Sequence, residues 1–332
     1  MKVAMLGPIA WRTPPLHYGP WELVTSLLAE GLVARGVDVT LFATLDSVTR
    51  AKLDGVCPRP YEEDPEADGR IWEALHVAHA LGRSGDFDLV HNHLDWLPLA
   101  FAGFARAPMV TTVHGFSSTR ILPAYQRSGS AFVSISDADR APGLDYLATV
   151  YHGVDPRELP FSPAGGDELV CFGRIHPDKG TADAIAIARR AGRPLVLCGP
   201  VQDARYFDDE IAPHIDDDRV RYLGSVAPRE RAVVLGTAAC LLHPIAFAEP
   251  FGLSVIEAMV CGTPVLAYPR GSMPEVVEDG VTGRLVAGVA AAAAAVDEVA
   301  GLDRRRCRRA ALERFSSDRM VDDYLGVYDR LL

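Results

Sequence analysis

Hydrophobic residues along this chain fall into short apolar runs that alternate with longer stretches of helical periodicity. In the first half, strands are predicted by the runs 3–6, 37–42, 89–91, 109–113, 131–135 and 149–151. Between the first two runs lies the stretch 21–35, in which Leu23, Leu27, Leu28 and Leu32 recur at helical spacing. That spacing places them on one face of a helix. The first half therefore predicts an alternation of strands and helices.

The second half repeats this rhythm. Strands are predicted by the runs 169–172, 195–198, 220–223, 240–243, 265–267 and 284–286, and helices by 181–191, 229–235 and 254–260. The alanine-rich stretch 290–295 predicts a surface helix, because alanine has the highest helix propensity. The tail 316–332 predicts a last amphipathic helix, with Met320, Tyr324, Val327, Tyr328 and Leu331 on one side.

Continuous apolar strands that alternate with helices are typical of parallel sheets covered by helices on both faces. A stretch rich in proline and glycine, 156–166, separates the two series and has the composition of a linker. The sequence therefore predicts an α/β fold with two Rossmann-like, doubly wound domains, residues 1–155 and 156–315. Ligands in such sheets bind beyond the carboxyl ends of the strands, so two domains that face each other would share one cleft.

Size and composition agree with this prediction. The chain has 332 residues, enough for two domains of about 150 residues each. Hydrophobic residues make up 48% and charged residues 23%, as in ordinary globular proteins. The 33 basic and 44 acidic residues give a formal net charge of -11. This charge disfavours nucleic acid as a partner, and it disfavours strong adhesion to anionic lipid.

Three further features bear on partners and compartment. The run 304–309 is strongly basic and predicts a solvated helix face, with a contact to anionic lipid or a partner as the alternative. The six cysteines are scattered without a C-x-x-C pair, which indicates free thiols in a reducing compartment. No apolar run reaches about 18 residues, and residues 1–7 predict a first strand rather than a signal peptide. We therefore expect a cytoplasmic protein without a transmembrane segment.

Two glutamates on either side of a predicted helix start give the strongest chemical signal. Glu249 and Glu257 lie eight residues apart, and Gly252 stands between them. A glycine lets the backbone approach a ligand closely, and a helix that begins near Leu253 and Ser254 directs free N–H groups at an anion. We expect Glu257 on the first turn. A nucleotide sugar, with a hydroxylated ring on each side of a diphosphate, would meet a carboxylate at each end. The alternative is two solvated glutamates beside an ordinary helix start.

A basic loop gives the second signal. The segment 173–180 directly follows the predicted strand 169–172, so Arg174 and Lys179 should stand at the carboxyl end of that strand. The forked guanidinium of arginine and the compact ammonium of lysine together are suited to neutralise a leaving diphosphate. A surface basic pair in a turn is the alternative. Neither the G-x-x-x-x-G-K pattern nor a G-x-G-x-x-G after the first strand is present, which disfavours an NTPase and a dinucleotide-dependent dehydrogenase.

The first domain offers weaker signals. Gly19 precedes the first helix, with Pro20 at its first position, which proline favours. His114 ends a strand, as His91, His93 and His152 do, and packing is the alternative for each. The spacing of these histidines lacks the tight pairing of zinc sites, so we expect no metal. Candidates for an acceptor wall are His17, Tyr18, Trp21, His93, Trp96 and Phe116, and core packing explains them equally well.

Taken together, these segments resemble the retaining glycosyltransferases of family 4, whose fold is the two-domain GT-B type. The resemblance covers nearly the whole chain. It rests on the segments 249–257, 258–265, 270–277, 279–283 and 173–180, together with Gly19, the turn 113–115 and the segment 153–155. The chain departs from the family at Pro20, where a second glycine is common, and at His152, where asparagine is usual.

The resemblance implies roles for individual residues. Glu249 would hold the hydroxyls of the donor sugar, and Glu257 the ribose hydroxyls. Arg174 and Lys179 would neutralise the diphosphate, and His114 would line the sugar site. The donor contacts implied are Gly19, Gly173, Arg174, Lys179, Gly224, Val226, Glu249, Phe251, Gly252, Leu253, Ser254 and Glu257. The last helix, 316–332, would cross back to the first domain.

The function implied is a metal-independent, cofactor-free hexosyl transfer with retention. The donor would be linked to UDP or GDP, and the acceptor would be a hydroxyl of a carbohydrate or small molecule. Without a clear protein nucleophile, the resemblance implies front-face departure, in which the leaving phosphate takes the proton of the acceptor. The alternatives are a nucleotide-sugar epimerase of the same fold and a non-catalytic protein that binds nucleotide sugars.

Overall fold

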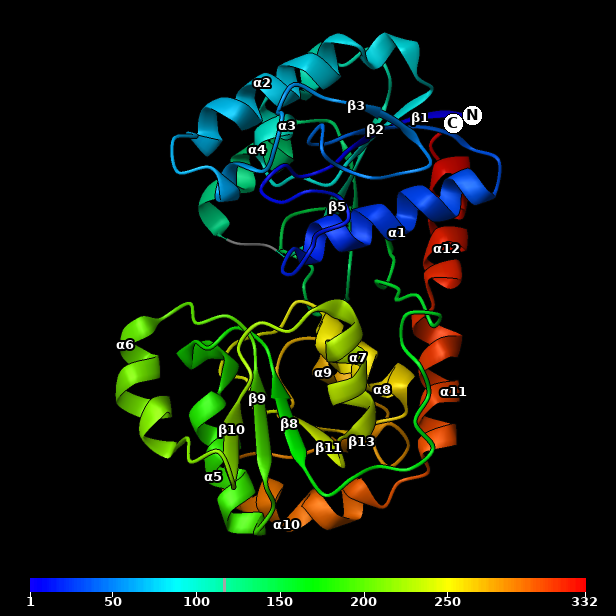
Figure 1. The fold of residues 1–332 in the computed structure, drawn as a ribbon. Coiled ribbons are helices and arrows are strands. Elements are labelled where there is room, and N and C mark those ends of the chain that lie inside the picture. Colours follow the sequence, from blue (N-terminus) through cyan, green and yellow to red (C-terminus); the bar gives the residue numbers. More distant parts are fainter. Residues whose placement is uncertain (116–117) are drawn as a thin grey trace. The chain divides into compact units, whose positions relative to one another are not determined.

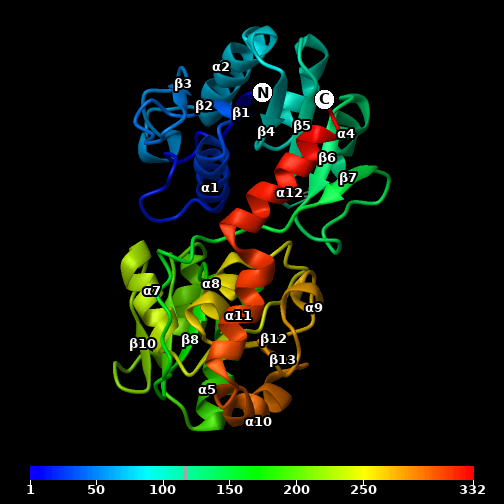
Figure 2. The same cartoon turned by 90° about the vertical axis from the view of Figure 1, so that its right-hand side faces the viewer.

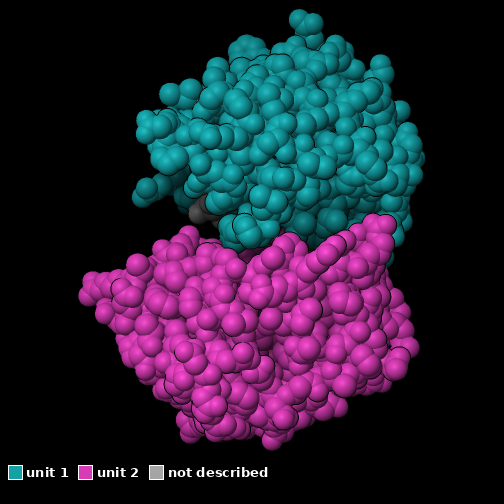
Figure 3. Space-filling model, in the orientation of Figure 1, with its two compact units in different colours: residues 1–153, 317–332 teal, residues 154–316 magenta. Residues whose placement is uncertain are grey.

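A computed structural model describes residues 1–115 and 118–332. These residues form two compact units (Figure 3). Unit 1 comprises residues 1–153 and 317–332, and unit 2 comprises residues 154–316. The C-terminal segment 317–332 is therefore part of the N-terminal unit. Among the helices of the described residues, none combines the length and hydropathy that a transmembrane span requires.

Unit 1 is built on one parallel sheet of seven strands (Figure 1). The strands are β1 (Lys2–Leu6), β2 (Asp38–Phe42), β3 (Lys52–Asp54), β4 (Leu89–Asn92), β5 (Met109–Val113), β6 (Ala131–Ser134) and β7 (Tyr146–Thr149). Their order is β3-β2-β1-β4-β5-β6-β7, and every neighbouring pair is parallel. The α-helices are α1 (Pro20–Ala34), α2 (Gly69–Gly82), α3 (Leu97–Ala100), α4 (Leu122–Arg127) and α12 (Ser317–Asp329).

Unit 2 has a parallel sheet of six strands in the order β10-β9-β8-β11-β12-β13. The strands are β8 (Leu169–Phe172), β9 (Leu195–Cys198), β10 (Val220–Tyr222), β11 (Cys240–His243), β12 (Val265–Ala267) and β13 (Gly283–Leu285). The α-helices are α5 (Thr181–Ala191), α6 (Ala204–Tyr206), α7 (Pro228–Thr237), α8 (Leu253–Cys261), α9 (Met273–Val276), α10 (Val289–Ala300) and α11 (Arg304–Phe315). In both sheets the strand order reverses next to the first strand. Ligands of doubly wound sheets bind outside the carboxyl ends of the strands at such a point.

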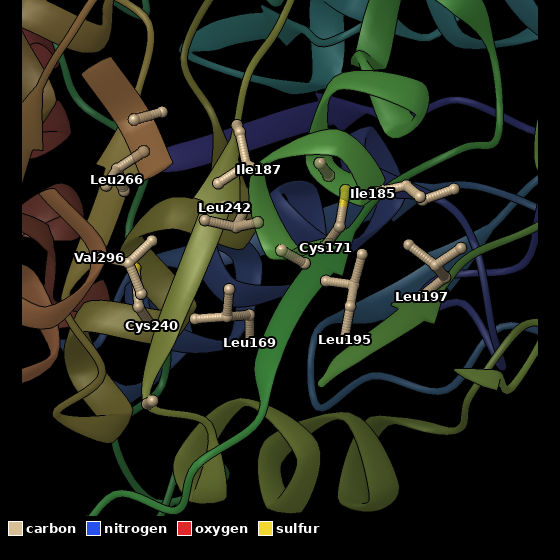
Figure 4. Close-up of a cluster of buried hydrophobic side chains, with 14 of the residues drawn as sticks. Leu169, Cys171, Ile185, Ile187, Leu195, Leu197, Cys240, Leu242, Leu266 and Val296 are labelled. Atoms are coloured by element: carbon tan, nitrogen blue, oxygen red, sulfur yellow. The ribbon is translucent and has the colours of Figure 1, made fainter. Parts of the chain in front are cut away.

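The core of unit 2 explains why the apolar runs form strands. Leu169, Leu195, Leu197, Leu242 and Leu266 project from one face of the sheet, where α5 and α10 cover them (Figure 4). Alternate residues of the same strands point to the other face, so a strand buried on both faces is mostly apolar. Fully burying one such side chain contributes about 1.5–3 kcal/mol.

Helix α12 is anchored in unit 1 by aromatic and polar contacts. Figure 2 shows it beside β4, β5 and β6. Its buried tyrosines reach the sheet: Tyr328 Oη lies 2.6 Å from His91 Nδ1, and Tyr324 Oη lies 2.6 Å from Thr112 Oγ1. On the outer side of α12, Arg35 of α1 forms ion pairs with Asp318 and Asp322.

The structure corrects several predicted elements. The strand predicted at 149–151 ends at Thr149 and comprises Tyr146–Thr149, because this edge strand is only half-buried and lacks a continuous apolar run. Helix α2 and strand β3 were not predicted. β3 is a short, partly exposed edge strand, and α2 exposes the apolar side chains of Ile71 and Leu75, which blurs its amphipathic pattern. Leu331 lies beyond the end of α12 and is only partly buried.

The basic run 304–309 is not simply a solvated helix face. Arg304 is buried at the start of α11 and donates hydrogen bonds to the carbonyl oxygens of Ser162, Ala238 and Gly236. Arg308 donates to the carbonyls of Leu159 and Val260. These two arginines satisfy backbone groups of the linker and of α7 and α8, whereas Arg305, Arg306 and Arg309 are exposed.

Candidate active site

An ion pair at the carboxyl end of the unit 2 sheet forms the centre of the site. Lys179 Nζ lies 2.6 Å from Glu249 Oε2, and the two side chains are only 16% and 11% exposed. His243, the last residue of β11, places Nε2 3.6 Å from the same oxygen. Burial favours the neutral carboxyl, but the His243 ring and the Lys179 ammonium outweigh it and lower the pKa of Glu249 to about 2. Glu249 is therefore a fixed anion and a hydrogen-bond acceptor.

The loop between β8 and α5 positions Lys179. Residues Pro177–Lys179 form a 3₁₀ turn, in which His176 Nδ1 accepts a hydrogen bond from the Asp178 N–H. Gly180 follows with φ 69°, and a Cβ there would lie 2.0 Å from the Pro244 carbonyl oxygen. Only glycine allows this close approach between the turn and the segment after β11. The contact holds Lys179 against the loop that carries Glu249.

Gly271 supports the Glu249 loop from the other side. A Cβ at Gly271 would lie 2.3 Å from both the nitrogen and the oxygen of Glu249. Beside it, the Ser272 N–H donates to the Glu249 carbonyl at 2.9 Å, and the Ser272 hydroxyl donates to the Phe251 carbonyl at 2.9 Å. The segment 270–273 therefore supports the loop 249–252 through close packing and hydrogen bonds.

The N-terminus of α8 lies directly after this loop. Gly252 occupies the N-cap position with φ 93°, and no side chain caps the helix. The first N–H groups of a helix have no partner inside the helix, and together with the helix dipole they favour an anion. Leu253 and Ser254 carry the first of these N–H groups. By contrast, the Phe251 side chain is buried and packs edge-on against Phe315 at 5.9 Å, so it belongs to the core.

Glu257 lies in a second, more deeply buried ion pair. It stands on the second turn of α8 rather than the first, and its Oε1 is 3.1 Å from Nη2 of Arg231 on α7. Burial raises the pKa of Glu257, and the Arg231 guanidinium opposes that rise. Arg231 also lies 5.9 Å from the ring centroid of Phe172. Sequence reasoning missed Arg231, because no pattern marks it as facing α8.

Three glycines lie together at the ends of neighbouring strands. Gly173, Gly199 and Gly224 follow β8, β9 and β10. A Cβ at Gly199 would lie 1.8 Å from the Gly173 carbonyl oxygen, and the Gly199 N–H donates to the Gly224 carbonyl at 2.8 Å. Arg174 next to this stack donates to the side chain of Gln202, and Val226 is buried beyond it. The structure thus collects Gly173, Arg174 and Gly224 at one edge of the sheet.

In unit 1, the glycine loop is tightly packed. Gly19 caps α1 with φ 151°, and a Cβ there would lie 2.8 Å from Pro15 Cβ and 3.0 Å from Glu22 Oε2. Glu22 is buried and accepts a hydrogen bond from the Trp11 N–H at 3.2 Å. Burial raises the pKa of Glu22 to about 7, although these backbone hydrogen bonds oppose the rise.

The acceptor candidates that the structure describes lie in different surroundings. His17, Tyr18 and Trp96 are exposed, whereas His93 is fully buried. Trp21 stacks on His114 with ring centroids 5.3 Å apart. Phe116 lies outside the described residues. Of the candidates that the structure describes, only Trp21 and His93 contact His114.

His114 belongs to a buried cluster of histidines. Its Nε2 lies 3.0 Å from His93 Nδ1, and its Nδ1 lies 3.3 Å from His152 Nε2. Burial lowers the pKa of His91 and His152 to about 3 and lowers that of His93 and His114 well below 6.5, so burial favours the neutral form of all four rings. Within residues 1–115 and 118–332, no group of three or more potential ligands has a metal-binding arrangement.

Comparison with known families covers both units. The family model "Glycosyltransferase Family 4" matches residues 22–157, and "Glycosyl transferases group 1" matches residues 159–314. Among curated relatives, the glycogen synthase of Mycobacterium tuberculosis (strain ATCC 25618 / H37Rv) is 29% identical, over 96% of this chain and 91% of its own. The D-inositol 3-phosphate glycosyltransferase of Mycolicibacterium smegmatis is 27% identical, over 91% and 84%.

Solved structures share the fold over the full chain. AviGT4, a glycosyltransferase involved in avilamycin A biosynthesis, has a TM-score of 0.77 at 26% identity and covers 100% of this chain and 98% of its own. A sucrose-phosphate synthase from Thermosynechococcus elongatus has a TM-score of 0.82 at 18% identity, with 100% and 99% covered. The Anabaena protein HepE, in complex with UDP and glucose, has a TM-score of 0.77 at 22% identity, with 100% of each chain covered.

Proposed function

Because this chain belongs to glycosyltransferase family 4, we propose that it transfers a hexose-type sugar from a UDP- or GDP-linked donor with retention of the anomeric configuration. Its fold is the GT-B fold. The acceptor we propose is a hydroxyl group of a carbohydrate or small molecule. The curated relatives at 27–29% identity are named a glycogen synthase and a D-inositol 3-phosphate glycosyltransferase, which supports this class of acceptor.

One observation carries the proposal: the buried Lys179–Glu249 pair stands next to the uncapped N-terminus of α8. A diphosphate at this helix end would meet the N–H groups of Leu253 and Ser254 and the ammonium of Lys179. Glu249, ionised by its neighbours, would accept hydrogen bonds from sugar hydroxyls beside the diphosphate. One edge of the sheet thus offers donors for the phosphates and an acceptor for the sugar.

The nucleoside would be held at the neighbouring ion pair. Glu257 is oriented by Arg231 through Oε1, which leaves Oε2 for the ribose hydroxyls. The glycines after β8, β9 and β10 keep the backbone clear of side chains along the same edge. We propose that the segment at Gly224 and Val226 contacts the base through its backbone.

The chemistry we propose is a front-face displacement. The bond between the anomeric carbon and the phosphate oxygen breaks, and the acceptor oxygen bonds to the same face of that carbon. The departing phosphate oxygen takes the acceptor proton, so no protein base is required. The protein stabilises the charge that develops on the phosphate, with Lys179, Arg174 and the end of α8 in place before the reaction. Each charge-assisted hydrogen bond contributes about 1.5–3 kcal/mol.

A donor screen followed by product analysis tests the proposal. Nucleoside diphosphates and their sugars are first screened by thermal shift, where binding at about 100 times Kd adds about 2.7 kcal/mol of stability. The donor selected is then offered with a panel of hydroxyl acceptors, with and without EDTA. We expect EDTA-insensitive release of nucleoside diphosphate and a glycoside with the donor's anomeric configuration, determined by NMR coupling constants.

The other outcomes separate the alternatives. Conversion of the donor without acceptor would identify an epimerase, and a thermal shift without turnover would identify a non-catalytic binding protein. An inverted product, or activity that disappears with EDTA and returns with a divalent cation, would overturn the mechanism. Glu257→Ala should abolish the shift, whereas Lys52→Ala, which removes an exposed ion pair with Asp38, should leave it unchanged.

A further inference from the structure

Three histidines form a continuous hydrogen-bonded chain in unit 1. His93 directly follows β4, His114 directly follows β5, and His152 follows β7. Because carboxyl ends of parallel strands meet at one edge of a sheet, residues far apart in sequence come together here. The links are His93 Nδ1 to His114 Nε2, at 3.0 Å, and His114 Nδ1 to His152 Nε2, at 3.3 Å. All three side chains are more than nine-tenths buried.

Proton counting restricts this chain to two arrangements. A neutral imidazole carries one N–H, so it donates at one nitrogen and accepts at the other. His114, bonded at both nitrogens, must do both. Its two neighbours must then point the same way, so the N–H groups run from His93 towards His152 or from His152 towards His93. The tautomer of each ring is therefore tied to that of the other two.

The surroundings fix the rings as well as their protons. Trp21 stacks on one side of His114, with an angle of 21° between the ring planes. The His91 ring is tilted by 41° against His93, with centroids 4.0 Å apart, but its own nitrogens lie 2.6 Å from the Tyr328 hydroxyl and 2.8 Å from the Thr112 hydroxyl. His91 is thus a packing neighbour outside the chain. His93 Nε2 is buried and has no hydrogen-bond partner among the described residues, so no contact there competes with the link to His114.

We propose that His93 and His152 are positioning residues that set the tautomer and ring orientation of His114. The catalytic consequence rests on the proposed function and on the role that the family resemblance implies for His114, which is to line the sugar site, but the tautomer coupling does not. The proposal also accounts for His152 at a position where the family usually has asparagine. The link to His114 is made by Nε2, the outer nitrogen, and the shorter asparagine side chain would not extend to it.

Amide substitutions test the two links separately. The asparagine amide lies near the position of Nδ1 and the glutamine amide near that of Nε2. His93→Asn and His152→Gln should therefore preserve the links, whereas His93→Gln and His152→Asn should break them. We expect the breaking pair to lower kcat about tenfold or more with KM changed less than about twofold, because misplacement by about 1 Å can cost up to 10²-fold. The preserving pair should stay within about threefold of wild type.

Nitrogen-15 NMR of the histidine rings reports the tautomer of each ring directly. A loss of stability alone would not change that tautomer. In wild type we expect one fixed tautomer at His114, and in His152→Asn and His93→Gln a change of its ring-nitrogen shifts. His91→Gln is the matched control, because it perturbs the same cluster without touching His114. It should lower the unfolding midpoint and leave the His114 signals in place.

The results separate this inference from the proposed function. A His114 tautomer that does not match those of His93 and His152 in wild type, or unchanged His114 signals in both breaking variants, would overturn the coupling whatever the activity. If the variants did not fold, the wild-type spectrum alone would still decide the coupling. A fixed tautomer that responds to the breaking variants, in a protein without transferase activity, would support the coupling and remove the proposed function instead.

Discussion

Both units gather polar residues at the edge of the sheet where the carboxyl ends of the strands meet. These residues form ion pairs in unit 2 and uncharged hydrogen-bonded clusters in unit 1. In unit 2, the polar residues at this edge form cation–carboxylate pairs, Lys179–Glu249 in the loops after the strands and Arg231–Glu257 between α7 and α8. In unit 1, the corresponding residues are neutral imidazoles that bond to one another and to hydroxyl groups. Both solutions avoid an unpaired buried charge, which is strongly unfavourable.

Both units are built on a parallel sheet, yet they differ in the charge of the residues at the edge where the carboxyl ends of the strands meet. The fold alone therefore does not determine the charge at this edge. In unit 2, a cation lies within 3.1 Å of each carboxylate and opposes the rise in carboxyl pKa that burial causes. In unit 1, His91, His93 and His114 form hydrogen bonds with imidazoles and hydroxyl groups, and burial lowers the pKa of these rings. The two edges should therefore respond to pH and to substitution in different ways.

The largest expected effect is a selective loss of stability of unit 1 in mild acid. The pKa of His91 and His152 is lowered to about 3, and that of His76 to about 4, from 6.5. The unfolded chain binds these protons first, so the contribution of these histidines is full above pH 6.5 and falls as the pH drops towards the folded values. Glu22 of the same unit opposes part of this loss, because its raised pKa of about 7 makes the folded state bind that proton first. At pH 5.0, 1.5 pH units below 6.5, each such histidine removes about 2 kcal/mol. Glu249 behaves oppositely, because its lowered pKa keeps its contribution intact down to about 4.5.

Tryptophan fluorescence makes this measurable, because Trp11, Trp21, Trp72 and Trp96 all lie in unit 1. Urea denaturation at pH 7.5 and 5.0 should show the fluorescence midpoint move to lower urea by more than the far-UV circular dichroism midpoint. Equal shifts of the two signals, or no shift of the fluorescence midpoint, would contradict the contrast between the units.

The next effect comes from breaking the central pair of unit 2. Lys179→Met leaves Glu249 buried without its cation, and removing one partner of a buried pair typically costs about 3–5 kcal/mol. The pKa of Glu249 should rise, and turnover should fall about tenfold or more. Adding Glu249→Gln should restore part of the stability but none of the turnover, as measured by urea denaturation and initial rates.

Lys52→Met is the matched control for that experiment. Its ion pair with Asp38 is exposed to solvent, and exposed pairs contribute little to stability. If Lys179→Met behaved like Lys52→Met in both stability and turnover, the Lys179–Glu249 pair would be an ordinary surface contact.

A smaller effect is expected from displacing the loop 249–252 without removing any charge. In Gly271→Ala, the new Cβ would lie 2.3 Å from the Glu249 backbone, so the loop 249–252 must shift. We expect about tenfold lower turnover with the charges of the site unchanged. At Gly280, φ is also positive at 76°, but no atom lies within 4 Å of a new Cβ. Gly280→Ala should therefore cost about 1–2 kcal/mol of backbone strain while turnover stays normal.

The smallest effect should come from the Arg231–Glu257 pair. In Arg231→Met, burial still raises the pKa of Glu257 and nothing opposes it, so the carboxylate becomes a poorer acceptor for ribose hydroxyls. We expect nucleoside diphosphate to bind about tenfold more weakly, or about 1.4 kcal/mol by calorimetry. Arg305 is exposed, so the variant Arg305→Met should bind nucleoside diphosphate with the affinity of wild type. Unchanged affinity in Arg231→Met would place the ribose elsewhere.

Much of the fold could be predicted from the sequence, because its signals are local. The strands at 109–113, 169–172, 195–198, 240–243 and 265–267 and the helix at 181–191 coincide with the structure. Strands buried on both faces are mostly apolar, and that pattern is visible in the sequence. Short or half-exposed elements, such as β3 and β7, carry no such signal.

The sequence by itself determined which residues stand at the ends of the strands, because strand, turn and helix start follow one another along the chain. Glu249, Gly252 and Lys179 could be named in this way. Only the tertiary structure decided what those residues touch. The strand order joins His93, His114 and His152, the packing of α7 on α8 gives Glu257 its Arg231, and α12 brings Tyr328 to His91. These contacts link positions far apart in sequence, and whether a buried group keeps its charge depends on such partners.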